Sequence, residues 1–348
     1  MTSRWQPARA GPQTGAVTAH DDSHPDEQAQ HPGGDGHSPE AAPEVSPEAA
    51  LETSLESAPS VARAEVGAGE AVRANRAWWD DNAADYYAEH GAFLGDAELV
   101  WGPEGWRESE LGLLGSLAGR DVLEVGAGAA QGARYVAGLG ARVVASDVSG
   151  GMLAAARRID AGRDGAVPLV QCDGCVLPFA DACVDVVFTA YGVLPFVADG
   201  GAFFAEAARV LRPGGRLVAA EPHPIRWCFP DVPGHEGLTA VTPYWDRRAY
   251  TERDARGTLT YAETHPTIET RVAQIVAAGL ALEQLREPRW PSHNPQTWGG
   301  WSPLRGEYLP GTIIWVAVRR DAARDAAHGG DVRSFTRQES LVRMRMTS

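Results

Sequence analysis

The sequence predicts an α/β protein whose mostly parallel β-sheet is covered by helices on both faces. Short apolar segments alternate with helical segments over about 100 residues in the middle of the chain. In addition, a glycine-rich turn joins the first of these apolar segments to the helix that follows it. In open sheets of this kind the ligand lies beyond the carboxyl ends of the strands, so we expect a binding crevice there.

The individual elements follow from local pattern. The segment 73–90 is rich in helix formers, and Trp79 and Tyr86 lie two helical turns apart, so that they share one face of the expected helix. Ser149 has the side chain and the position of a helix N-cap. The expected strands are 121–125, 141–146, 167–172, 184–189 and 216–220, and the expected helices between them are 130–138, 152–158 and 203–211.

The pattern changes after residue 221. Segment 222–266 is irregular and rich in proline and aromatic residues, with short strands expected near 258–263. A helix is expected at 267–278, and the last two strands, 280–285 and 312–318, should pair antiparallel at the sheet edge. No internal repeat is present.

Three regions differ in composition. We expect 1–69 to be a disordered, acidic, proline-rich tail, because it holds too little apolar surface to offset its ordering entropy. We expect residues 70–320 to form the folded domain. Its insertions at 222–266 and 286–310 should lie on the acceptor side of the crevice. The polar segment 321–348 should be a flexible C-terminal tail.

Charge and composition exclude several classes of function. The formal net charge of the 348-residue chain is −15, which argues against binding nucleic acid through a basic face and against docking on an anionic membrane. The four cysteines are too few for a disulfide framework, and no apolar run is long enough for a signal peptide or a transmembrane helix. We therefore expect a cytoplasmic protein without a nucleic-acid or membrane partner. The sequence gives no indication of oligomeric state.

The glycine-rich turn is the strongest functional signal. It contains Gly126 and Gly128, which allow close approach of the backbone to a ligand, and it precedes a helix whose first N–H groups are free to donate. A dinucleotide site would need a small residue where Gln131 stands, and Glu124 at the end of the strand would repel a pyrophosphate. A ligand with a cationic amino-acid end suits this turn better.

With this turn the sequence resembles the class I S-adenosylmethionine (SAM)-dependent methyltransferases. Glu124-x-Gly126-x-Gly128 is similar to the family's first motif, although Ala130 stands where a third glycine is frequent. The resemblance implies a Rossmann-like, seven-stranded sheet with an N-terminal helical cap, and SAM as the cofactor. It places Asp147 on the ribose hydroxyls, Asp173 at the adenine amine and Tyr191 near the methionine end; Val148 and Gly174, which follow the two acids, belong to the same expected site. Arg212-Pro-Gly-Gly-Arg216 is similar to the family's turn into the fifth strand.

Two further resemblances extend over roughly residues 73–320. The segment 79–86 is similar to a family helix of the pattern aromatic-Asp-x-x-Ala-x-x-Tyr that folds over SAM, which implies that Tyr86 closes the methionine end. The segments 90–96, 100–105 and 298–306 resemble a group of actinobacterial SAM methyltransferases. That resemblance brings no known acceptor with it.

Tryptophan is absent between residues 121 and 221 but frequent in the flanking segments, which indicates an aromatic acceptor pocket under the 222–266 insertion. Among the histidines, His223 is the candidate general base, because it follows the fifth strand, whose end should face the site. The sequence Cys172-x-x-Cys175 lacks the second pair of a zinc site, so we expect no metal.

We therefore predict an enzyme that transfers the methyl group of SAM to a small or lipophilic acceptor. Two alternatives stay open. A non-catalytic SAM-binding protein would have the same motifs, because methyl transfer requires no invariant catalytic residue. An NAD(P)-dependent oxidoreductase is disfavoured by Glu124, by Gln131 and by the absence of lysine.

Overall fold

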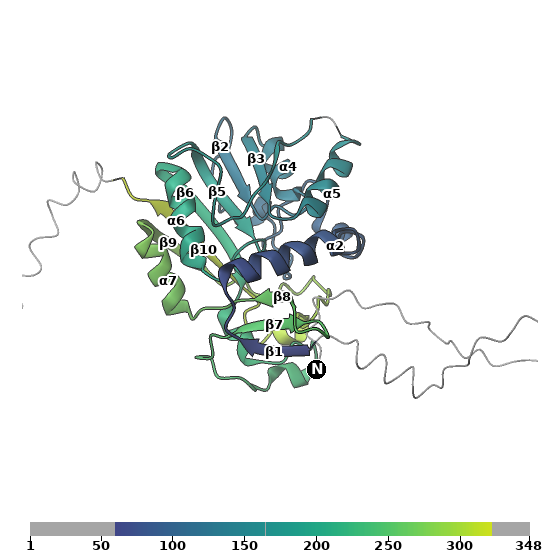
Figure 1. Cartoon of the computed structure of the whole chain (residues 1–348). Coiled ribbons are helices and arrows are strands. Elements are labelled where there is room, and N and C mark those ends of the chain that lie inside the picture. The colour runs from purple at the N-terminus through teal and green to yellow at the C-terminus, as the bar shows by residue number, and fades with distance from the viewer. Residues whose placement is uncertain (1–59, 164, 322–348) are drawn as a thin grey trace, which may run out of the picture. The chain divides into compact units, whose positions relative to one another are not determined.

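The computed structural model describes residues 60–163 and 165–321. Its main sheet has seven strands in the order β4-β3-β2-β5-β6-β10-β9 (Figure 1). These strands are β2 (Asp121–Val125), β3 (Arg142–Asp147), β4 (Leu169–Gln171), β5 (Val184–Ala190), β6 (Leu211–Pro222), β9 (Leu280–Arg286) and β10 (Thr312–Arg319). The pairs from β4 to β6 are parallel, whereas β10 runs antiparallel to both β6 and β9. The predicted seven-stranded, mostly parallel sheet and its antiparallel edge pair are confirmed.

Helices cover both faces of this sheet, as predicted. The side chains of a strand point alternately to the two faces, and Val122 and Leu123 accordingly belong to two separate apolar clusters. The cluster around Val122 includes residues of α4 (Gln131–Gly138) and α5 (Gly150–Asp160), and the cluster around Leu123 includes residues of α6 (Gly200–Val210) and α7 (Ile268–Ala277). Ser149 caps α5, since its side chain accepts a hydrogen bond from the Met152 N–H.

A long N-terminal helix, α2 (Ala68–Leu94), lies between α5 and a second, small sheet (Figure 1). The small sheet has the antiparallel order β1-β7-β8, formed by β1 (Ser60–Ala64), β7 (Ala249–Arg253) and β8 (Leu259–Glu263). The short elements are α3 (Glu108–Leu111), α8 (Pro303–Gly306) and the 3₁₀ helices η1 (Pro224–Cys228) and η2 (His235–Leu238). The expected N-terminal helical cap is thus present. The small sheet packs against it through β8.

One expected boundary is wrong. Residues 60–64, which we assigned to the disordered tail 1–69, form β1, and α2 begins at Ala68. β1 owes its structure to backbone pairing with β7, some 190 residues later in the chain, and such long-range pairing leaves no trace in local composition. The remaining predictions for the two tails, over 1–59 and 322–348, lie outside the described residues.

A buried polar network joins the antiparallel edge to its covering helix. Arg271 of α7 donates from Nε and Nη2 to the two carboxylate oxygens of Glu221, over 2.7 and 2.6 Å, and Trp315 Nε1 donates to the same carboxylate over 2.7 Å. The Arg271 and Glu221 side chains are 1% and 3% exposed. A bidentate pair of this kind fixes the orientation of α7 on β6 and β10.

We predict that Glu221→Gln lowers the free energy of unfolding by about 3–5 kcal/mol, because it leaves the Arg271 guanidinium buried without its counter-charge. The matched control is Glu283→Gln, which removes the half-exposed partner of Arg216 and should cost at most about 1 kcal/mol. Urea denaturation of both variants checks this, and equal losses would contradict it.

Candidate active site

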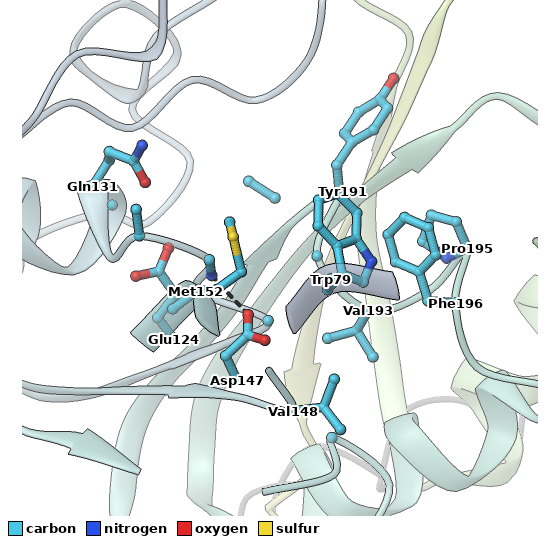
Figure 2. A pocket seen from close by; sticks show the side chains of 18 of the residues that line it. Trp79, Glu124, Gln131, Asp147, Val148, Met152, Tyr191, Val193, Pro195 and Phe196 are labelled. Atoms are coloured by element: carbon cyan, nitrogen blue, oxygen red, sulfur yellow. Dashed lines mark hydrogen bonds between the residues drawn. The ribbon is translucent and has the colours of Figure 1, made fainter. Parts of the chain in front are cut away.

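A cavity opens at the carboxyl ends of β2, β3 and β5, where an open α/β sheet of this topology places its ligand. All nine predicted cofactor-site residues line it: Tyr86, Glu124, Gly126, Gly128, Asp147, Val148, Asp173, Gly174 and Tyr191. Figure 2 shows Glu124 and Asp147 on one side of the cavity and the rings of Trp79 and Phe196 on the other. The cavity therefore has an acidic side and an aromatic side.

The glycine turn approaches the next strand end closely. Gly126 and Gly128 have φ values of 68° and 54°, in the left-handed region that favours glycine. A Cβ at Gly126 would lie 2.5 Å from the carbonyl carbon of Gly192, and a Cβ at Gly192 would collide with the Gly126 backbone. Only glycine at both positions lets the turns after β2 and β5 touch and form the floor of the cavity.

Asp147, at the end of β3, is held by backbone donors. Its Oδ2 accepts from Gly128 N over 2.7 Å, and its Oδ1 accepts from Ser149 N over 2.8 Å. Burial raises the pKa of this carboxyl to about 6, and the two N–H groups partly offset that shift. The turns after β2 and β3 are thereby joined through a single side chain at the cavity wall.

Glu124, at the end of β2, is a second buried acid of the site. Its Oε2 accepts from the Ala133 N–H over 2.7 Å, near the start of α4. Burial nevertheless raises its pKa to about 8, and the nearby Asp147 raises it further. A cation bound in the cavity would favour the ionised form of this carboxyl.

Asp173 has a second, local role. Its Oδ1 accepts from the Cys175 N–H over 2.8 Å, which closes the turn after β4. Gly174 fits closely in this turn, since a Cβ there would lie 3.1 Å from Val125 and Val193. The turn thus brings Asp173 to the cavity next to Val148 of the neighbouring strand end.

The aromatic side is built on α2. Trp79 contacts Tyr86 edge to face at a centroid distance of 5.2 Å, which confirms that the two share a helix face, and it contacts Phe196 at 5.4 Å. Trp298 lies 6.3 Å from Tyr86 and stacks on His90 at 4.0 Å. These rings come from three distant parts of the chain.

Asp80 docks α2 on the site. Its Oδ1 accepts from Ser149 Oγ over 2.8 Å and from Gly151 N over 2.9 Å, at the start of α5. A Cβ at Gly151 would lie 2.6 Å from the Asp80 carbonyl oxygen, so glycine is needed for this approach. Ser149 thus caps its own helix and also fixes α2 beside the acidic side of the cavity.

Tyr191 has a strained backbone, with φ at 62°, a region that bulky residues rarely adopt. Its hydroxyl lies 2.6 Å from Thr312 Oγ1 of β10, and Figure 2 shows the ring pointing away from the carboxylates of Glu124 and Asp147. With this backbone conformation, the Tyr191 side chain lines the cavity and its hydroxyl reaches β10.

His223 does not line the cavity. Its Nδ1 accepts from Ile225 N over 3.1 Å as the N-cap of η1, and its Nε2 lies 2.8 Å from Glu287 Oε1. Both ring nitrogens are therefore used within the protein, and the side chain is buried. The structure thus gives His223 a capping position and does not support the predicted role as general base.

Sequence reasoning missed several lining residues. Gly192, Val193, Pro195 and Phe196 follow β5, and Met152 lies in the first turn of α5. For the four residues after β5, the only sequence signal was their place directly after a predicted strand of the sheet. Within the described residues, no group of three or more His, Cys, Asp or Glu residues could hold a metal ion.

Comparisons with known proteins identify the class of protein to which this fold belongs. A family model described as a methyltransferase domain matches residues 123–219. The demethylmenaquinone methyltransferase of Mycobacterium sp. (strain JLS) is 44% identical over 116 residues, which are 33% of this chain and 47% of that protein. The demethylmenaquinone methyltransferase of Corynebacterium urealyticum is 38% identical over 210 residues, which are 60% of this chain and 79% of that protein.

A solved structure supports the fold. An S-adenosylmethionine-dependent methyltransferase structure from Listeria monocytogenes superposes with a TM-score of 0.52 at 18% identity, covering 63% of this chain and 99% of the other. The chain spans about half the length of the mycobacterial relatives that it matches, 47% of each. With the corynebacterial match, these findings show that the chain belongs to the class I SAM-dependent methyltransferases, whose methyl donor is SAM. No helix among the described residues is long and apolar enough to cross a membrane.

We predict that Gly192→Ala destabilises the protein by about 1–3 kcal/mol, because the added methyl group forces the two turns at the cavity floor apart. The control is Gly138→Ala in α4, where no atom lies within 4 Å of an added Cβ. That substitution should be neutral or stabilise by up to about 1 kcal/mol. Thermal unfolding of both variants checks the contrast, and an equally stable Gly192→Ala protein would refute it.

Proposed function

We propose that this chain transfers the methyl group of SAM to a lipophilic aromatic acceptor of the hydroquinone type, such as reduced demethylmenaquinone. The observation that carries the proposal is the distribution of charge in the cavity. Three acids, Glu124, Asp147 and Asp173, line one side, and the lining residues of the described chain include no Arg, Lys or His. This set suits a cationic ligand with hydroxyl groups and opposes a pyrophosphate, which would need positive partners.

The residues present fit SAM. The turn at Gly126 and Gly128 is left-handed, and a Cβ at Gly126 would collide with the Gly192 backbone, so glycine keeps the backbone of this turn at the cavity floor. We assign the ribose hydroxyls to the Asp147 carboxylate, the adenine amine to Asp173 and the cationic amino-acid end to Glu124. Tyr86 and Tyr191 also line the cavity, and we assign them to the methionine end of SAM, where the reacting methyl group would face the acceptor.

The acceptor class follows from the other side of the cavity. Trp79, Phe196 and Trp298 present rings to it, and Pro103 and Pro195 add flat apolar surface. A planar aromatic ring is the ligand that such walls hold best. The bacterial relatives are named for demethylmenaquinone, a lipophilic quinone whose quinone ring becomes aromatic on reduction.

Alignment supplies most of the catalysis in this account. Bound SAM supplies an electrophilic methyl group on a sulfonium, and methyl transfer is an in-line displacement. Trp79 of α2 and Phe196 of the turn after β5 pack against each other and form an aromatic wall, on which the acceptor ring would lie and from which water is excluded. In favourable cases, alignment alone lowers a barrier by about 7–11 kcal/mol. His223 has no part in this mechanism. The cytoplasmic location stays a prediction.

We predict that the affinity for S-adenosylhomocysteine (SAH) rises with pH through the ionisation of Asp147. Below a pKa of about 6 the carboxyl is protonated and accepts the ribose hydroxyls poorly, so affinity at pH 5 should be about tenfold lower than at pH 7. Asp147→Asn should weaken binding at pH 7 by at least about tenfold and abolish this rise. Calorimetry from pH 5 to 9 checks both expectations.

The control for that series is Asp185→Asn, which alters an acid of the same sheet that lies outside the cavity. It should keep the wild-type affinity and the wild-type pH dependence. A second rise in affinity near pH 8, from Glu124, should persist in Asp147→Asn. A pH dependence that is unchanged by Asp147→Asn would contradict the assignment of Asp147.

The activity itself is tested with methyl-labelled SAM and reduced demethylmenaquinone. We expect a labelled lipid product whose formation requires the protein and is inhibited by SAH. SAH binding without any transfer to a lipophilic quinol would favour the non-catalytic alternative, and binding of NAD in place of SAH would favour the oxidoreductase.

A further inference from the structure

Glu263 stands at the end of β8 and lines the aromatic side of the cavity. It is 2% exposed, and it belongs to the small sheet, far from the glycine turn in sequence. None of the roles assigned above uses this carboxyl. A buried acid on the aromatic side of the cavity is costly unless each of its oxygens has a partner.

The backbone around Glu263 is fixed to the cavity wall on both sides. Asn75 of α2 donates to the carbonyl oxygens of Ala262 and Phe196 over 3.0 and 2.9 Å. On the other side, Thr264 N donates to the Pro195 carbonyl oxygen over 2.7 Å. Since Pro195 and Phe196 themselves line the cavity, these bonds hold Glu263 where an aromatic acceptor would lie.

Only one oxygen of the Glu263 carboxyl is satisfied by the protein. Tyr261 donates its hydroxyl to Oε1 over 2.6 Å, whereas Oε2 is buried and has no hydrogen-bond partner. The nearest cation, Arg226, has its Nη1 3.8 Å from Oε2 but lies closer to Asp231, with Nη2 3.0 Å from Oδ1. Oε2 is therefore available to a donor on the ligand.

The neighbouring strand offers an internal comparison. Tyr250 donates to Glu252 over 2.6 Å, as Tyr261 does to Glu263, and in the antiparallel register Tyr250 faces Glu263 and Glu252 faces Tyr261. The two Tyr-x-Glu pairs thus share one face of the small sheet. Both acids are buried, but only Glu263 lines the cavity.

We propose that Glu263 is the base on the acceptor side: its Oε2 accepts a hydrogen bond from an aromatic hydroxyl of the acceptor and takes that proton during methyl transfer. This inference rests on the proposed function and names the group that activates the acceptor. It requires an acceptor with a hydroxyl on its ring, which excludes quinones in the oxidised form.

The acceptor O–H bond breaks, the proton moves to Glu263, and the electron pair makes the ring nucleophilic. A ring carbon bonds to the methyl carbon as the sulfur–methyl bond breaks, and that pair stays on the sulfur of the SAH product. The ring C–H proton then replaces the one lost from oxygen. Glu263 releases one proton to solvent in each turnover.

The surroundings of Glu263 suit a base. Burial raises the pKa of this carboxyl above its ordinary value, and Arg226 of η1 and the Tyr261 hydroxyl act in the opposite direction. Asp231 and Glu252 of β7 raise the pKa further. A carboxyl whose pKa is raised toward neutrality accepts a proton from a phenolic hydroxyl more readily than an exposed one.

The experiment compares two probes, 1-naphthol and 1-methoxynaphthalene, on the full chain with and without saturating SAH. Wild type should bind 1-naphthol at least about tenfold more tightly, because only the hydroxyl can donate to Oε2. In Glu263→Gln, the Tyr261 hydroxyl should still donate to the side-chain oxygen, which leaves the NH₂ group facing the cavity. The preference for 1-naphthol over 1-methoxynaphthalene should then fall to about twofold or less. SAH affinity should not change.

Glu252→Gln is the matched control and should keep the preference of the wild type. Wild type supplies a second measurement that does not depend on a variant's folding: 1-naphthol affinity should rise with pH as Glu263 ionises, and 1-methoxynaphthalene affinity should not. Equal affinity for both probes, or no binding of either, in wild type would overturn the proposal, as would a preference that survives in Glu263→Gln. If the wild-type protein does not bind SAH, the proposed function itself is overturned.

Discussion

The site depends on the contact between two turns. β2 lies between β3 and β5 in the sheet. After β2 the chain continues toward one face of the sheet and after β5 toward the other, so that a crevice opens above the point where the two turns meet. The backbones of Gly126 and Gly192 touch at its floor, which no side chain would allow. The other contacts follow from this floor, since Asp147 accepts from the first turn and Pro195 and Phe196 continue the second.

The two sides of the cavity use opposite physical means. The acidic side, where we propose that SAM binds, concentrates two carboxyls whose pKa values burial raises, Glu124 and Asp147, and a cationic ligand there would favour their ionised form. The acceptor side uses aromatic rings from α2, from the turn after β5 and from the segment before β10. The small sheet then brings Glu263 into this apolar wall. In the proposed function, SAM and its acceptor would meet in this one cavity, as methyl transfer requires.

Local sequence was sufficient where the determinants are local. The strands β2 to β6, the Ser149 cap and the acids at strand ends were predictable, because each depends on a short pattern of apolar, glycine and acidic residues. β1 and β7 were not, because their pairing joins residues far apart in the chain. For the same reason no pattern indicated Gly192 or Glu263. His223 followed the expected strand, but the helix that begins beside it takes up its ring nitrogen.

The most direct test of the central claim, that one cavity holds SAM on its acidic side and the acceptor on its aromatic side, is a crystal structure of the chain with SAH. We expect the ribose hydroxyls within hydrogen-bonding distance of Asp147 and the sulfur directed toward Trp79 and Tyr86, with space for an aromatic ring beside Glu263. SAH bound elsewhere, or with its sulfur directed away from the aromatic side, would contradict it.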